Sequence, residues 1–177
     1  MKIAIVLAVI LVVFLVVVAL QPSQFHIARS TTIAAAPAEI FPRINDLRRT
    51  HEWSPWMKLD PAAKITFEGP AAGVGASSTW AGNSKMGEGR QTIVESRASE
   101  AVKTRLDFVK PFKSTALAEV TLKPDGARTL VTWSLSGENN FISKAFCLFM
   151  NQDKMIGTPF EEGLAMLKTQ VEARPAK

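Results

Sequence analysis

An unbroken apolar run occupies residues 3–20, at the very beginning of the chain. In a helix that rises about 1.5 Å per residue, this run spans roughly 27 Å, which is close to the hydrocarbon thickness of a bilayer. We therefore predict that residues 1–20 form a helix that crosses a membrane and stays in the mature protein. A cleaved signal peptide is the alternative, because Val17-Val18-Ala19 offers small side chains for cleavage, although such apolar cores usually span only about 7 to 15 residues.

The charges around this run predict its orientation. Lys2 is the only charged residue before Arg29, and positively charged flanks tend to stay on the cytoplasmic side. The rest of the chain is then expected to face outward from a cytoplasmic membrane that it crosses once, which in a bacterium means the periplasm. Residues 21–24 form a short polar connector, so the domain over residues 25–173 is expected to lie close to the bilayer.

The first part of that domain predicts one strand and one brief helix. Between Phe25 and Ile33 apolar and polar residues alternate, and β-branched side chains are frequent, as in a strand. Pro37 suits the first turn of a helix, and apolar residues recur at helical spacing as far as Leu47. Pro42 interrupts that pattern and predicts a short or bent helix.

From residue 64 to residue 137 the pattern consists of short alternating segments separated by turn residues, with no helical stretch between them. The expected strands are residues 65–67, 77–81, 90–95, 100–109, 115–123 and 129–135. The alternation turns Lys103, Arg105, Asp107 and Glu119 toward water and leaves Thr104 as a polar residue of the inner face. Residues 90–95 have two possible inner sets, which are Gln91, Ile93 and Glu95 or Arg90, Thr92 and Val94.

A helix at the end of the chain is expected to cover this sheet. Its apolar stripe is Phe160, Leu164, Leu167 and Val171, and we expect it to open near Thr158-Pro159 with Glu161 and Glu162 in its first turn. A second apolar stretch, residues 141–150, precedes it, with Gly157 between the two. Helices that cover one face of an antiparallel sheet predict an α+β domain.

Few residues suggest catalytic or metal chemistry. His26 and His51 are the only histidines, and their spacing matches no metal motif. Cys147, the single cysteine, lies in an apolar stretch and is expected to be a buried spectator thiol. We expect no bound metal and no cofactor. The sequence also shows no combination of acid, base and nucleophile that would predict an enzyme.

The charge distribution gives no nucleic-acid signature. Beyond residue 20 the chain carries a net charge of +4, and its basic residues are scattered along the sequence. This pattern is typical of a solvated surface with weak attraction to anionic headgroups.

Several short motifs, taken in order, resemble one protein family. They are Trp53-Ser54-Pro55-Trp56, Gly73-Val74-Gly75, Trp80-Ala81-Gly82-Asn83, Gly87-Glu88-Gly89, Val131-Thr132-Trp133-Ser134-Leu135-Ser136-Gly137, Phe149-Met150, Asp153-Lys154-Met155-Ile156-Gly157 and Phe160-Glu161-Glu162-Gly163-Leu164. Over residues 25–173 the chain is similar to the START-like SRPBCC superfamily, in its branch of polyketide cyclase/dehydrase and lipid-transport-like proteins. The resemblance implies the helix-grip fold, a curved seven-stranded antiparallel sheet around a long C-terminal helix with an apolar cavity between them.

Large apolar side chains are the candidate ligand-binding residues, because a curved sheet and one helix leave space that such side chains line. They are Trp53, Trp56, Trp80, Phe108, Trp133, Phe149, Met150 and Phe160. The leading hypothesis is a membrane-anchored binder or carrier of a hydrophobic small molecule that is lipid-, quinone- or polyketide-like. The alternatives are a cyclase or dehydratase that acts on such a molecule, and a partner-binding module whose cavity is vestigial and whose aromatic residues only fill a core.

Overall fold

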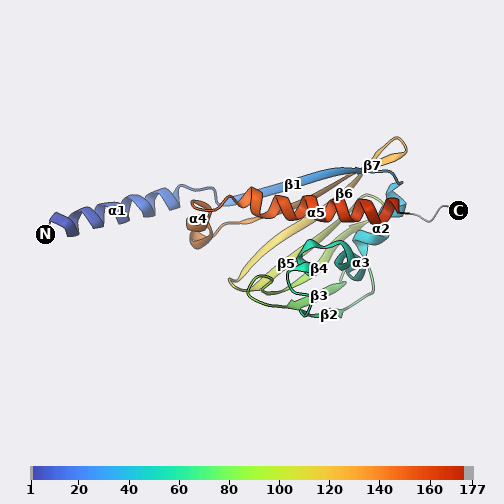
Figure 1. The fold of residues 1–177 in the computed structure, drawn as a ribbon, viewed down its shortest axis with the longest axis horizontal. Helices are drawn as coiled ribbons and strands as arrows, with labels where there is room; N and C mark the ends of the chain where they lie inside the picture. The colour runs from blue at the N-terminus through green and yellow to red at the C-terminus, as the bar shows by residue number, and fades with distance from the viewer. Residues whose placement is uncertain (1, 174–177) are drawn as a thin grey trace.

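The computed structural model describes residues 2–173, and Met1 of the expected membrane segment lies outside this range. Within the described range the strands form one seven-stranded antiparallel sheet in the order β1-β7-β6-β5-β4-β3-β2. The long helix α5 (Gln152–Glu172) runs along one face of this sheet, as Figure 1 shows. This arrangement confirms the α+β helix-grip fold.

Each expected strand is present, with bounds that differ by a few residues. They are β1 (Gln24–Ile33), β2 (Lys64–Glu68), β3 (Ser77–Ala81), β4 (Glu88–Arg97), β5 (Ala101–Lys110), β6 (Ser114–Asp125) and β7 (Arg128–Glu138). β2 to β7 pair with their neighbours in sequence, whereas β1 pairs with β7, so that Phe25 lies opposite Gly137 and Ile33 opposite Thr129. This last pairing joins the first and last strands of the domain.

A bulge in β4 determines which of its side chains face the helix. Ile93 pairs with Thr104 of β5, but Glu95 pairs with the adjacent residue Lys103, which leaves one residue of β4 out of the ladder. An extra residue in one strand shifts the alternation of side chains beyond it by one position. Gln91 and Ile93 consequently face inward and Glu95 faces outward, so the first of the two sets considered for this strand is correct for two residues and wrong for Glu95.

The outward-facing charges of the central strands pair with one another. Lys103 Nζ lies 3.1 Å from a carboxylate oxygen of Glu95 and 3.8 Å from one of Glu119, and Arg105 Nε lies 2.9 Å from Asp107. The hydrogen bond from Lys103 lowers the pKa of the Glu95 carboxyl below its usual value. These contacts confirm that this face of the sheet is the solvated one.

Short helices close one end of the sheet. They are α2 (Pro37–Asn45), α3 (Leu47–Trp53) and the 3-10 helix η1 (Pro55–Lys58), and a further helix, α4 (Phe141–Cys147), lies at the other end, between β7 and α5. Pro37 occupies the first turn of α2, as expected, and Pro42 lies inside that short helix. Asp46 separates α2 from α3 and caps the latter, since its carboxylate accepts a hydrogen bond of 2.9 Å from the Arg48 N–H.

The C-terminal helix is longer than the sequence suggested. We expected it to open near Thr158-Pro159, but α5 begins at Gln152 and carries Pro159 in its interior. Asn151 is the N-cap, because its side chain accepts a hydrogen bond of 2.9 Å from the Lys154 N–H. Pro159 removes one backbone hydrogen bond, and packing against the sheet keeps the helix continuous across it.

Arg29 of β1 ties the first half of α5 to the sheet. Its Nη2 lies 2.7 Å from Asp153 and its Nε lies 2.7 Å from Glu161, and its hydrogen bond lowers the pKa of the Asp153 carboxyl. The guanidinium passes over α5 at Gly157, where any Cβ would overlap it. Gly157, which we expected to separate two helical segments, is instead the point where α5 and Arg29 cross.

The core lies between α5 and the sheet. Phe160, Leu164 and Leu167 of the expected stripe are almost completely buried, and they meet inward residues of the strands and of α2. By the usual relation between apolar burial and free energy, each such side chain stabilises the fold by about 1.5 to 3 kcal/mol. The stripe therefore holds α5 along most of its length.

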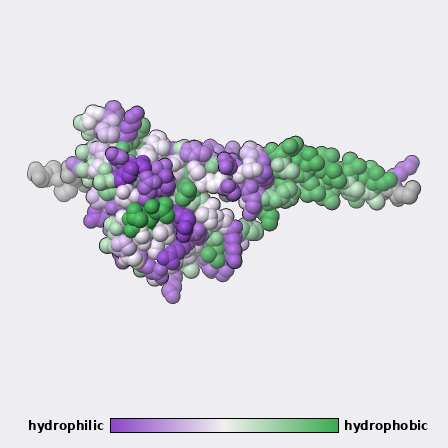
Figure 2. Space-filling view, turned by 180° about the vertical axis from the view of Figure 1, so that it is seen from behind, coloured by the Kyte–Doolittle hydropathy of each residue, from purple (hydrophilic) through white to green (hydrophobic). Residues whose placement is uncertain are grey.

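The first helix, α1 (Lys2–Ala19), extends away from the domain. Its side chains are exposed except for Val18, and Figure 2 shows them as one continuous apolar surface. By length and composition α1 can cross a bilayer, which is a property that membrane anchors and signal sequences share.

Replacing Gly157 with alanine is expected to displace the Arg29 guanidinium from its two carboxylates. Alanine is better than glycine in a helix by about 1 kcal/mol, so the change should stabilise a chain in which Arg29 is already alanine. In the native chain the loss of the Arg29 ion pairs should cancel this gain. The effects of Gly157→Ala and Arg29→Ala on the free energy of unfolding should therefore be non-additive by about 1 kcal/mol or more. Denaturant unfolding of both single variants and the double variant measures this coupling, and additive effects would show that the guanidinium does not require glycine there.

Candidate functional site

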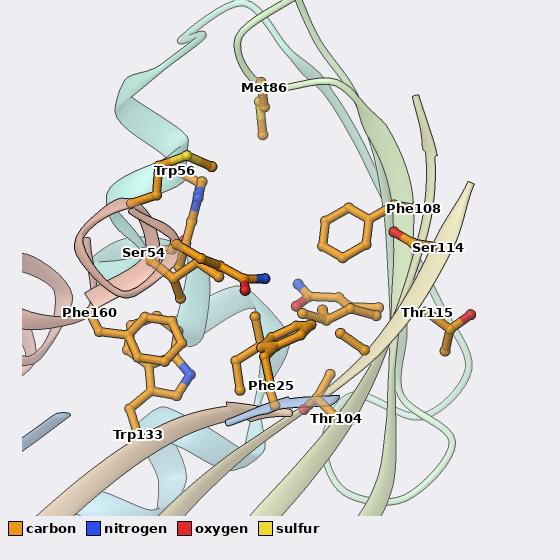
Figure 3. A pocket seen from close by; sticks show the side chains of 18 of the residues that line it. Phe25, Ser54, Trp56, Met86, Thr104, Phe108, Ser114, Thr115, Trp133 and Phe160 are labelled. Carbon is orange, nitrogen blue, oxygen red and sulfur yellow. The ribbon is translucent and has the colours of Figure 1, made fainter. Parts of the chain in front are cut away.

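A cavity of about 610 Å³ lies between the inner face of the sheet, α5 and the short helices. The close view in Figure 3 shows side chains from both sides of the domain pointing into it, with Phe108 and Ser114 across from Trp56 and Phe160. Its volume falls within the roughly 300 to 1,000 Å³ of sites that hold small organic molecules.

Small residues at the centre of the sheet create this space. Ala118 of β6 lies between Thr104 of β5 and Leu135 of β7, and all three line the cavity. Two residues earlier in β6, Ala116 lies opposite Gly137, and a Cβ on that glycine would overlap the Phe25 ring. The α5 stripe cannot fill the volume left above these short side chains, so the interior stays open.

Four aromatic rings pack together at the closed end of the cavity. The rings of Trp133 and Phe160 are nearly parallel, at 5° with centroids 4.2 Å apart. The edges of Trp53 and Trp56 meet the Trp133 ring at centroid distances of 4.9 Å and 5.5 Å, and the Trp53 indole N–H donates to the Arg43 carbonyl oxygen. These contacts fix the wall, while one side of the cluster borders the cavity.

A second aromatic pair lies on the opposite wall. Trp80 of β3 and Phe108 of β5 meet edge to face with centroids 5.8 Å apart, across Gly89 of the strand between them. A Cβ at Gly89 would lie within 2.6 Å of a Trp80 ring atom, so the glycine is what lets the indole lie flat against β4. Both aromatic side chains are only half-buried, as expected of a wall that faces open space.

The structure places seven of the eight candidate binding residues around this one cavity. They are Trp53, Trp56, Trp80, Phe108, Trp133, Met150 and Phe160. Phe149 is the exception: it is 81% exposed, lies outside the cavity lining, and has its ring 6.5 Å from that of Phe14 in α1. The sequence could not separate it from its neighbour Met150, because the direction of each side chain depends on how α4 ends.

A group of three hydrogen-bonded polar residues at the cavity wall was not identified from the sequence. Gln91 Nε2 donates to His51 Nε2 at 2.8 Å and to Ser78 Oγ at 2.9 Å, while Ser78 Oγ and His51 Nε2 are 3.3 Å apart. His51 and Gln91 line the cavity, and Ser78 lies buried behind them. The three residues come from α3, β3 and β4, so no spacing along the chain could have grouped them.

Burial favours the neutral form of the His51 imidazole. Removal from water disfavours its charged form and lowers its pKa from the ordinary value of 6.5. Because Gln91 donates to Nε2, the proton of the neutral ring lies on Nδ1. The group can therefore accept or donate weak, uncharged hydrogen bonds at the cavity wall.

The lining carries few charges. Among the described residues that border the cavity, the titratable ones are His51, Glu138 and Cys147, and none is a lysine, arginine or aspartate. Cys147 is partly buried, and its thiol donates to Gln152 Oε1 at 3.5 Å, which is consistent with a spectator thiol. Within residues 2–173 no cluster of His, Cys, Asp and Glu has the composition to hold a metal ion.

Comparison with known families identifies the fold's relatives. The family model of polyketide cyclase/dehydrase and lipid transport proteins matches residues 24–172. The chain belongs to this family. The match covers nearly the whole domain and confirms the family that its motifs resemble.

Solved structures agree on the fold at low sequence identity. Ara h 8.0201 is 12% identical with a TM-score of 0.57, over 85% of this chain and 99% of that one. An Aha1 protein of Colwellia psychrerythraea, solved as a dimer, is 15% identical with a TM-score of 0.59, over 84% and 97%. The di-domain ARO/CYC protein BexL is 11% identical with a TM-score of 0.61, over 90% of this chain and 53% of its own. No curated protein sequence matches the chain.

Trp133→Ala removes a ring that contacts three other aromatic rings, so it should lower the free energy of unfolding by about 3 to 4 kcal/mol. Trp80→Ala removes a half-buried ring with one aromatic contact and should cost only about 1 to 2 kcal/mol. Urea titration followed by circular dichroism measures both losses. A loss for Trp133→Ala no larger than that for Trp80→Ala would contradict the tight packing of Trp133 in the aromatic cluster.

We expect the free energy of unfolding to decrease as the pH is lowered, because of His51. A histidine whose pKa is lowered by folding binds more protons in the unfolded state, so its contribution is fully present above pH 6.5 and is lost as the pH falls through the lowered value. Urea titrations between neutral pH and pH 5 should show a shallower dependence for His51→Gln than for the native chain. A dependence that is equally steep in His51→Gln and in the native chain would show that His51 is not its source.

Proposed function

We propose that this protein binds a neutral, largely apolar small molecule in the cavity between the sheet and α5, while α1 holds it in a membrane. The observation that carries the proposal is an open volume of about 610 Å³, lined mainly by aromatic and aliphatic side chains, at the place where the domain would otherwise have a filled core. Membership of a family of cyclases, dehydrases and lipid transport proteins supports a hydrophobic ligand.

The lining favours an uncharged ligand. An ion transferred to an apolar interior loses hydration worth many kcal/mol unless a counter-charge replaces it. The described lining offers no cationic side chain, and its one carboxylate, Glu138, is exposed at the end of β7. A lipid-, quinone- or polyketide-like molecule without a buried charge fits these conditions.

Polar atoms on the wall can orient such a ligand. The lining includes the Gln91 amide, the His51 imidazole and the side chain of Thr104 in β5. The indole of Trp133 turns its nitrogen toward the cavity in Figure 3. A carbonyl or hydroxyl oxygen on an otherwise apolar molecule would find both donors and acceptors here.

The proposed location follows from α1. Its apolar run is close to the thickness of the hydrocarbon layer and longer than the usual core of a signal peptide. We propose that it is retained as an anchor and that the domain faces outward, with the ligand drawn from molecules that partition into bilayers.

A cyclase or dehydratase is the second candidate, and His51 is the observation that favours it. A neutral imidazole on the wall of an apolar cavity is a suitable general base. Its Nε2 already accepts a hydrogen bond from Gln91, so a substrate would have to displace that amide before a proton could move. Binding requires no such rearrangement and is therefore the function that we propose first.

The proposal is tested on the full chain, extracted with detergent from membranes that have been washed with high salt. Mass spectrometry of organic extracts should find an apolar compound that co-purifies with the protein. Ala118→Phe places a ring in the open centre of the cavity and should reduce the compound by about tenfold, an effect that needs a loss of only about 1.4 kcal/mol in binding.

The control is Leu117→Phe, one residue away on the exposed face of the same strand, which should leave the compound in place. Equal amounts of the compound in both variants would contradict binding in the cavity. Soluble protein that begins near Leu20 would contradict the anchor and support a cleaved signal peptide.

A further inference from the structure

One end of the cavity is bordered by large apolar side chains that are exposed to solvent. We call this set the apolar rim: it consists of Phe112 from the β5–β6 turn, Ile142 and Phe146 from α4, Met150, and Met155 from α5. All five line the cavity as well as the surface. Contiguous exposed apolar side chains around a cavity are unfavourable in water and mark a surface that is normally covered.

The apolar rim is continuous with the helix that we propose to be in the membrane. Figure 1 shows α4 beside the end of α1, and Lys144 of α4 donates to the Ala19 carbonyl oxygen at 3.4 Å. The Phe149 ring, directly before Met150, lies against Phe14 of α1 with centroids 6.5 Å apart. Phe14 is six residues before Leu20, which places it about 9 Å inside the apolar run. Any bilayer that surrounds α1 to its end would therefore also surround Phe149.

The charges beside the apolar rim suit a lipid surface. Lys113 follows Phe112 and Lys154 precedes Met155, and neither ammonium has an ion pair among the described residues. Aromatic and aliphatic side chains interleaved with lysines are typical of segments that lie in the interface of an anionic membrane. In the structure only residues 20–23 lie between the end of α1 and the start of β1, and this segment is too short to lift the domain away from that interface.

We propose that the apolar rim is inserted in the outer surface of the bilayer that α1 crosses, so that the cavity opens directly into lipid. This inference rests on the proposed insertion of α1. A hydrophobic ligand could then pass between bilayer and cavity without crossing water, which removes the main barrier to its transfer. Phe149 is exposed and does not line the cavity, and in this arrangement the same bilayer covers its ring.

The test uses the full chain with Cys147→Ser, reconstituted in vesicles of phosphatidylcholine and phosphatidylglycerol. A single cysteine is introduced at Phe112→Cys, Ile142→Cys or Val74→Cys and labelled with the fluorophore NBD. The native side chains at these positions are similarly exposed, at 56%, 57% and 59%, but Val74 lies in the loop before β3, outside the cavity lining. Nitroxide-labelled lipid should quench most of the fluorescence at positions 112 and 142 and little at 74, whereas aqueous iodide should show the reverse order.

Each other result has a distinct meaning. A chain that floats with the vesicles but gives position 112 the same quenching as position 74 overturns the insertion of the apolar rim and leaves the anchor intact. Labels at 112 and 142 that neither quencher reaches would indicate a second protein copy on this surface and also overturn it. A chain that does not float with the vesicles overturns the insertion of α1, and with it this inference, while ligand binding remains tested by Ala118→Phe.

Discussion

The packing of α5 across the sheet depends on the stack of Trp133 and Phe160. The two rings bring the last strand and the last helix into contact at 4.2 Å, and Trp53 and Trp56 close around them from α3 and η1. Gly163 permits this approach, because a Cβ there would lie 2.7 Å from the Trp133 ring. The short helices, β7 and α5 thus share one aromatic cluster, and Arg29 holds the other half of α5 in line.

The cavity follows from what this cluster leaves unfilled. With α5 held at the aromatic cluster and at Gly157, its side chains cannot descend to Ala116 and Ala118 in the middle of the sheet. The β4–β5 ladder also carries two register shifts, one that leaves out a residue of β5 and one that leaves out a residue of β4, and such bulges bend the strands that carry them. A filled core would have needed larger residues at these central positions, so open space is a consequence of side-chain size at the sheet's centre rather than of loose packing.

The same geometry relates the cavity to the membrane proposal. Its closed end carries the aromatic cluster and the neutral group of His51, Gln91 and Ser78, and its open end carries the apolar rim beside α1. A ligand with one polar oxygen in an otherwise apolar body could place that oxygen inward and leave its apolar remainder near the lipid. Both ends of the cavity therefore favour the same class of neutral molecule.

The sequence by itself determined the strands, the apolar first helix and the α5 stripe, because burial on one face imposes a period of two or 3.6 residues. Its motifs also indicated the family, and seven of the eight large apolar side chains that it offered as candidates line the cavity. Only the tertiary structure decided that α5 begins at Gln152, since the Asn151 cap and contact with Arg29 outweigh Pro159. It likewise decided the orientation of Glu95, the outward position of Phe149 and the meeting of His51 with Gln91. Each of these depends on residues far apart in the chain, through a bulge, a helix end or a packed neighbour, and no local pattern encodes such contacts.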